Sequence, residues 1–256
     1  MKIVVKVGTS TLTHITGCVN IRRIEKLVKV LSDIKNAGNQ VILVSSGAIA
    51  MGVGKLNLEK RPEDIAGKQA AAAVGQCELM YTYDKLFLQY NQTVAQILLT
   101  AEDLRDTDRH KKFEDTMERL MKLRVLPIIN ENDTVSTDEI KIGDNDTLAA
   151  IVAESVRADL LVLMSDINGL YDKDPHIYDD AKLIDDVYEL DENIMSLGGG
   201  AGTARGTGGM MTKLCAAKIA SDAGCDMIIM HGDRPDELYN IIDGNPVGTR
   251  FHARKV

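Results

Sequence analysis

Residues 3–8 have the sequence IVVKVG, an apolar and β-branched run that ends at a glycine. Such a run predicts a buried strand. Similar apolar runs occupy residues 41–44, 93–99, 125–129, 160–164 and 227–230. Segments with helical spacing lie between them, at residues 21–37, 65–89 (one helix or two), 108–123, 146–156, 210–223 and 236–243. Strands that alternate with helices, several of them apolar throughout, predict a three-layer α/β/α sandwich with a mainly parallel open sheet.

Composition limits the kinds of function that this chain can have. Its 256 residues carry a net charge of −8, and aromatic residues make up only 4%. These values argue against nucleic acid and an anionic membrane as partners. The four cysteines are scattered without a CxxC pair, so we expect reduced thiols rather than zinc or disulfides. Met1 leads directly into the first strand and no apolar run reaches the roughly 18–20 residues of a membrane span, so we expect a cytoplasmic location.

In parallel sheets, ligands bind outside the carboxyl ends of the strands. Lys6 lies inside the first apolar run, where a charge is costly unless it meets a negative partner. It is either an edge-strand lysine that faces water or a lysine aimed at a phosphoryl group. Ser46 and Gly47 follow the second strand, in a turn of small residues that opens a helix. That turn is either an ordinary helix cap or an anion site on backbone N–H groups.

An Asx-rich segment follows the strand at 125–129, with the sequence NENDTVSTDEIKIGDNDT at residues 130–147. We expect a short hairpin strand at 139–142 within it. The EF-hand spacing for calcium is not met. The segment is therefore either a solvated acidic turn or a site that recognises a substrate amine and organises catalytic lysines.

Residues 198–213, GGGAGTARGTGGMMTK, contain seven glycines and then enter a predicted helix that carries Lys213. Glycine lets backbone N–H groups approach a ligand, and a helix N-terminus favours phosphate. The alternative is a flexible surface loop. The Walker, Rossmann and protein-kinase motifs are absent, so a phosphate site here needs another architecture. Ser165 and Asp166 follow the strand at 160–164, where a nucleotide base or ribose could rest.

Six segments in this order resemble the amino acid kinase family. They are KVGTS at 6–10, VSSGAIA at 44–50, NEND at 130–133, IGDND at 142–146, LY at 170–171 followed by DP at 174–175, and GTGGMMTK at 206–213. The resemblance runs from Met1 to about His252. The NEND and GDND segments point to the branch of the family that phosphorylates glutamate. Many members of that branch continue into an RNA-binding-like PUA domain, whereas we expect one kinase domain over residues 1–256 and no PUA domain. Met211 stands where a serine is often found.

The resemblance implies transfer of the γ-phosphoryl group of ATP, with Mg²⁺, to the side-chain carboxylate of L-glutamate, the first step of proline synthesis. The N-terminal part would bind glutamate and the C-terminal part ATP. The catalytic residues that it implies are Lys6, Lys213 and Asp146, with Asp146 pairing with both lysines. The glutamate site that it implies contains Ser46, Gly47, Asp133, Asp144 and Asn145. The ATP site that it implies contains Lys6, Gly8, Ser165, Asp166, Thr207, Gly208, Gly209, Met210, Met211, Thr212 and Lys213.

The resemblance also implies a homo-oligomer, a dimer or tetramer, with inhibition by proline, and a glutamyl phosphate reductase as a functional partner. Three other interpretations remain open from the sequence. One is another member of the family, with acetylglutamate, aspartate, carbamate or UMP as the acceptor. A second is a catalytically silent sensor of glutamate or proline. The third, a nicotinamide-dependent oxidoreductase, is disfavoured because the glycine run follows no clear strand.

Overall fold

The structure, a computed structural model, describes residues 1–14, 16–136, 145–175, 177–199 and 209–254. Its described strands form one sheet of eight in the order β3-β4-β2-β1-β5-β7-β8-β6. Neighbouring strands are parallel except β7 and β8, which are antiparallel. The strands are β1 (Lys2–Val7), β2 (Gln40–Ser45), β3 (Val94–Leu99), β4 (Leu126–Glu131), β5 (Leu160–Ser165), β6 (Asp186–Val187), β7 (Asp226–His231) and β8 (Thr249–Phe251). The mainly parallel sheet that the sequence predicts is therefore confirmed.

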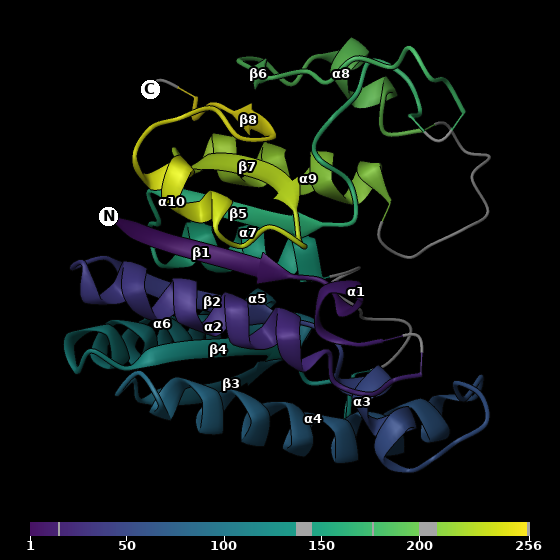
Figure 1. The fold of residues 1–256 in the computed structure, drawn as a ribbon. Coiled ribbons are helices and arrows are strands. Elements are labelled where there is room, and N and C mark those ends of the chain that lie inside the picture. Colours follow the sequence, from purple (N-terminus) through teal and green to yellow (C-terminus); the bar gives the residue numbers. More distant parts are fainter. Residues whose placement is uncertain (15, 137–144, 176, 200–208, 255–256) are drawn as a thin grey trace.

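Helices cover both faces of this sheet (Figure 1). They are α1 (Thr9–Leu12), α2 (Ile21–Asn36), α3 (Ala48–Lys55), α4 (Ile65–Leu88), α5 (Ala101–Arg105), α6 (Thr107–Lys122), α7 (Asn145–Ser155), α8 (Glu192–Ser196), α9 (Met210–Asp222) and α10 (Glu237–Ile242). One apolar core lies between the sheet and α2, α4 and α10, and a second lies between the sheet and α6, α7 and α9. The three layers follow from strands that are apolar on both sides.

The central strand β1 shows how one segment serves both cores. Side chains alternate between the two faces of a strand. Ile3, Val5 and Val7 pack in the core with α2, α4 and α10, and Val4 packs in the core with α7 and α9. Lys6, two residues after Val4, therefore points into the α7–α9 layer. Because Lys6 is also the penultimate residue of β1, its side chain enters that layer near the carboxyl edge of the sheet.

Several parts of the fold differ from the sequence-based expectation or go beyond it. Residues 65–88 form one continuous helix, α4, although the alanine-rich pattern left two helices open. Its Gly75 packs against α3 so closely that a Cβ atom there would lie 1.8 Å from the carbonyl oxygen of Ala48. β8, a three-residue strand that pairs with β7 and β6, was not expected from the sequence, and neither were β6 and the short helices α1, α5 and α8. The expected hairpin strand at 139–142 lies outside the described residues.

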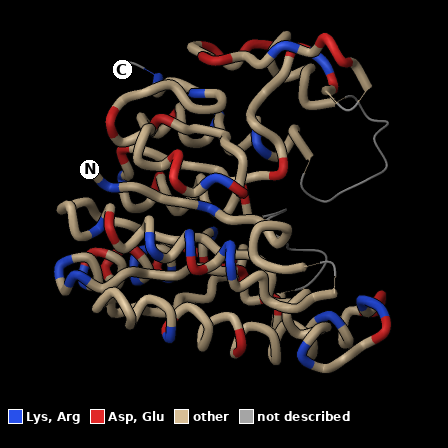
Figure 2. Tube along the Cα trace, in the orientation of Figure 1, with Lys and Arg blue, Asp and Glu red and all other residues tan. Residues whose placement is uncertain are grey.

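Charged residues of both signs occur throughout the described chain. Figure 2 shows Lys and Arg interspersed with Asp and Glu along the Cα trace rather than in separate segments. No helix in the described ranges is long and apolar enough to cross a membrane. All four cysteines are free.

Candidate active site

A buried carboxylate, that of Asp146, lies between two lysines from distant parts of the chain. One of its oxygens, Oδ1, lies 2.5 Å from Nζ of Lys6, and the other, Oδ2, lies 3.0 Å from Nζ of Lys213. Asp146 is 1% exposed, Lys213 6% and Lys6 9%. The structure thus brings together the three residues that the resemblance assigns to catalysis.

Three secondary-structure elements hold this cluster at the carboxyl edge of the sheet. Lys6 is the penultimate residue of β1, which pairs with β2 on one side and β5 on the other. The alternative of an edge-strand lysine facing water is therefore wrong. Asp146 is the second residue of α7, and Lys213 lies in the first turn of α9. The cluster forms because a strand end and two helix starts meet there.

The two lysines determine the charge state of Asp146. Burial by itself raises the pKa of this carboxyl, but the charges and hydrogen bonds of Lys6 and Lys213 lower it more, and the pKa lies below its usual value. Two ammonium groups and one carboxylate leave a net charge of about +1 in a nearly dry site. A positive charge held without water attracts an anion strongly. This cluster can therefore stabilise a phosphoryl group during transfer.

Three helices near the cluster begin without a capping side chain. Gly8, Gly47 and Gly209 cap α1, α3 and α9, and none of these caps has a side-chain hydrogen bond to the helix. By contrast, α2, α4, α5, α6 and α8 start at Asn, Asp or Thr side chains that accept from the helix. Gly47 also has φ of 97°, a conformation that favours glycine. Uncapped N–H groups at these starts are suited to bind anionic groups.

Asn145 connects α7 to the strands beside the cluster. Its amide nitrogen Nδ2 donates to the carbonyl oxygen of Ser45 at 3.0 Å, to Oγ of Ser46 at 2.7 Å and to Oδ1 of Asn130 at 3.0 Å. Of these residues, Ser46 and Asn145 were assigned to the glutamate site from the sequence. Asn130 was missed, although its position next to a predicted strand end was the signal that could have found it.

The remaining predicted residues lie around the same edge or outside the described ranges. An ideal Cβ atom at Gly8 would lie 3.9 Å from Nζ of Lys6. Ser165 ends β5, next to β1, and its hydroxyl donates to Asp166 at 3.0 Å. Asp133 lies in the turn after β4. Met210 and Met211 begin α9, and Thr212 Oγ1 contacts Oδ2 of Asp146 at 3.4 Å. Three predicted residues, Asp144, Thr207 and Gly208, lie outside the described residues.

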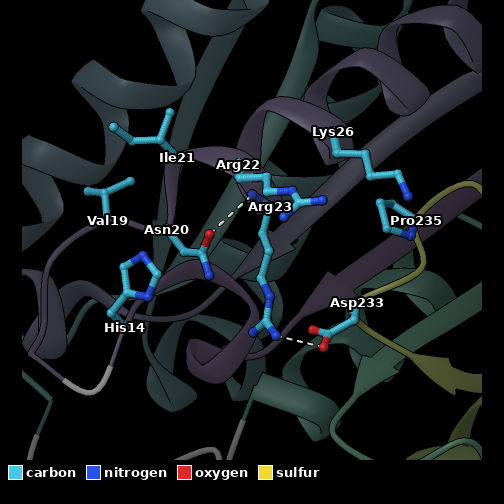
Figure 3. Close-up of a pocket in the computed structure, with 9 residues that line it drawn as sticks. All are labelled: His14, Val19, Asn20, Ile21, Arg22, Arg23, Lys26, Asp233 and Pro235. Atoms are coloured by element: carbon cyan, nitrogen blue, oxygen red, sulfur yellow. Dashed lines mark hydrogen bonds and ion pairs between the residues drawn. The ribbon is translucent and has the colours of Figure 1, made fainter.

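A separate cavity of about 610 Å³ opens at the start of α2 and is lined by His14, Arg22, Arg23 and Lys26 among others (Figure 3). Arg23, which lines this cavity, also forms hydrogen bonds to two segments at the carboxyl edge of the sheet. Its guanidinium donates to the carbonyl oxygen of Ser10 at 2.8 Å and to Asp233 at 2.6 Å. The segment after β1 is thereby linked to the loop after β7, although the lysine cluster does not line the cavity.

A resident metal site is not evident in the described parts of the chain, where no group of three or more His, Cys, Asp and Glu side chains could hold an ion. Both carboxylate oxygens of Asp146 contact lysines.

Comparison with known proteins identifies the family of this chain. Residues 1–231 match the model of the amino acid kinase family. A glutamate 5-kinase of Clostridium perfringens is 52% identical, over 99% of this chain and 96% of the relative. A glutamate 5-kinase of Caldanaerobacter subterraneus is also 52% identical, over 100% of this chain and 68% of that longer relative.

Solved structures with the same fold are more distant in sequence. A carbamate kinase from Giardia lamblia bound to AMP-PNP matches with a TM-score of 0.68 at 16% identity, covering 98% of both chains. An isopentenyl phosphate kinase from T. acidophilum, in a product complex, matches with a TM-score of 0.65 at 18% identity, covering 98% of this chain and 100% of the other. At such identities the likeness establishes the fold alone.

Proposed function

This chain belongs to the amino acid kinase family, among its glutamate 5-kinases, and we propose on that basis that it transfers the γ-phosphoryl group of ATP to the side-chain carboxylate of L-glutamate. The product would be glutamyl 5-phosphate, the first intermediate of proline synthesis. The observation that carries the proposal is the buried Asp146 carboxylate with a lysine on each oxygen. The acceptor is inferred from the names of the relatives.

The chemistry needs positioning and charge neutralisation more than proton transfer. A carboxylate is already a nucleophile, so no general base is required. Its oxygen attacks the γ-phosphorus while the bond from that phosphorus to the bridging oxygen of ADP breaks. The obstacle is repulsion between two anions, and the net positive charge of the lysine cluster opposes it. Lys6 and Lys213 would contact the transferring group from two sides, and Asp146 would hold both ammonium groups in place.

Glutamate would lie on the β2–α3–α7 side of the cluster. Ser46 and Asn145 are hydrogen-bonded to each other there, and the uncapped start of α3 at Gly47 offers N–H groups to a carboxylate. Asp133 would contact the α-ammonium group, and Asp144 would help to position Mg²⁺ or the substrate. In this arrangement the N-terminal part of the chain binds the acceptor.

ATP would lie on the α9 side. The uncapped start of α9 at Gly209 and the residues up to Lys213 would hold its phosphates, with Gly8 close by. Ser165 and Asp166 would contact the nucleoside, and Thr207 and Gly208 complete the proposed site. When bound, Mg²⁺ supplies further neutralisation of the phosphate charge. We also propose a cytoplasmic homo-oligomer, and a reductase that consumes the labile acyl phosphate.

The substrate assignment is tested with purified protein, ATP and Mg²⁺. L-glutamate, N-acetylglutamate, L-aspartate, carbamate and UMP are offered separately, ADP release is measured, and hydroxylamine traps any acyl phosphate. We expect turnover and hydroxamate with L-glutamate alone. Turnover with a different acceptor would replace the substrate, and binding of glutamate without turnover would favour a sensor.

Replacing Asp133 by alanine is expected to raise the KM for L-glutamate by roughly 10-fold or more, with a smaller change in kcat, because a lost charge contact to the ammonium group weakens binding in both ground and transition states. Initial rates at varied glutamate and saturating ATP measure the effect. The matched control is Asp84→Ala, at an exposed position of α4. An unchanged KM in Asp133→Ala would remove this residue from the substrate site.

A further inference from the structure

Gln76 is a buried glutamine on α4 that lies one hydrogen bond away from the residues beside the lysine cluster. We propose that Gln76 is a positioning residue: it orients the amide of Asn130, and through it the substrate-binding Asn145. The inference rests on the proposed function, because it is tested through the KM for L-glutamate. It adds a residue from a helix that contributes no residue to the proposed catalytic or binding sites.

The contact between Gln76 and Asn130 has a definite direction. Nδ2 of Asn130 donates to Oε1 of Gln76 at 2.9 Å, and the two residues are 8% and 2% exposed. The donor end of the Asn130 amide is thereby turned toward α4. Its oxygen, Oδ1, then faces the opposite way and accepts from the backbone N–H of Glu131 at 2.9 Å and from Nδ2 of Asn145 at 3.0 Å.

The orientation of Asn130 matters because an amide has one accepting end and one donating end. If the Asn130 amide turned over, its NH₂ group would face the NH₂ group of Asn145, and two donors would meet. The two hydrogens of the Asn145 NH₂ group, which three acceptors share, would be left with Ser45 and Ser46, and the hydrogen bond that joins β4 to α7 through Asn130 would be lost. Since Asn145 begins α7, directly before Asp146, such a change reaches both the glutamate side and the lysine cluster.

The same face of α4 supports the site at a second point. Tyr83, seven residues after Gln76, is fully buried, and its hydroxyl lies 3.0 Å from Oγ of Ser45. Residues seven apart lie on one face of a helix. Gln76 and Tyr83 thus contact residues that accept hydrogen bonds from Asn145. Burial of an amide is costly unless it is hydrogen-bonded, and the buried amide of Gln76 forms its hydrogen bond with Asn130 beside the site.

The experiment compares Gln76→Leu with Gln76→Glu. Leucine removes the acceptor for Asn130, whereas a glutamate carboxylate keeps an acceptor at the same length. We expect Gln76→Leu to raise the KM for L-glutamate about 10-fold, with the KM for ATP changed by less than about 2-fold. Gln76→Glu should stay within about 3-fold of the wild-type KM for glutamate, which is the rescue that an orienting role requires.

Gln92→Leu is the matched control. Gln92 is also a buried glutamine, 6% exposed, and its amide bonds to Lys35 and Asn36 rather than to the site. We expect this variant to lose thermal stability while both KM values stay at wild type. Gln76→Met, which also lacks the acceptor but keeps a flexible side chain, replaces Gln76→Leu if that variant does not fold.

Three results would overturn the inference. A normal KM for glutamate in folded Gln76→Leu or Gln76→Met would show that Asn130 needs no orientation from α4. An equal rise in Gln92→Leu would assign the effect to general loss of packing. A wild-type protein that does not phosphorylate glutamate would refute the proposed function itself, and this result is distinguishable because it precedes any variant.

Discussion

Replacing Lys213 by methionine is expected to reduce kcat by about 10²–10³-fold, as is typical when a group that stabilises transition-state charge is removed. Methionine keeps an unbranched side chain, one atom shorter than lysine, but lowers the net charge of the cluster from about +1 to zero. The protein should stay folded, because the Asp146 carboxylate keeps Lys6 as its partner at 2.5 Å. ADP release at saturating glutamate and ATP measures the change, and thermal unfolding checks the fold.

Lys6→Met should have an effect of the same size, since the two ammonium groups contact the two oxygens of one carboxylate. Lys213→Arg should rescue poorly, because the planar guanidinium is larger and has a different reach. The matched control is Lys218→Met, an exposed position on the same helix. Its turnover should stay near that of the wild type. Near-normal turnover in either buried-lysine variant would contradict a mechanism that uses both lysines.

The two lysines of the cluster were predictable because they stand out in the sequence, whereas the pairing of Asp146 with both was implied by the family resemblance. Lys6 interrupts an apolar strand, where burial of a charge demands a partner. Lys213 follows a glycine run into a helix, and parallel strands bring such segments to one edge. The alternation of side chains along β1 then determines which layer Lys6 enters.

The supporting residues were not predictable in this way. Gln76 and Tyr83 occupy a helix whose sequence looks like ordinary packing, and their role exists only because α4 lies against β2 and β4. The strand β8 was missed because three residues are too few to show periodicity, and its pairing is decided by β7. Contacts between segments that are distant in the chain leave no pattern in the neighbouring sequence from which they could be predicted.

Replacing Asp146 by asparagine is expected to lower the free energy of unfolding by about 3–5 kcal/mol, because two buried ammonium groups then lose their common counter-charge. For a chain of this size, the melting temperature should fall by roughly 6–20 °C. Turnover should also fall sharply, since the lysines are no longer held in place. Denaturant unfolding and ADP release measure the two effects on the same preparation.

The stabilisation by Asp146 should depend on pH in one direction. Its pKa in the folded protein is lowered from the ordinary value of 3.8, so the unfolded chain takes up the proton first as the pH falls. The stability difference between wild type and Asp146→Asn should therefore be complete above about pH 5 and shrink as the pH falls through 3.8 and below. Unfolding by denaturant at several pH values tests this. A difference that stayed constant down to pH 3 would mean that the carboxylate charge is not the source of the stability.

Combining Asp146→Asn with Lys213→Met separates the two roles of the cluster. The double variant leaves one ammonium group beside a neutral amide, so the repulsion between buried like charges disappears. We expect it to regain about 1–3 kcal/mol relative to Asp146→Asn, a coupling energy typical of contacting residues. Its turnover should remain at least as low as that of Lys213→Met, because no charge at the transferring group has been restored. Asp146→Asn with Lys218→Met should regain nothing. If the double variant were no more stable than Asp146→Asn, repulsion between the two lysines would not be the reason that Asp146→Asn is unstable. The carboxylate of Asp146 would then not act as the bridge that holds the two lysines together.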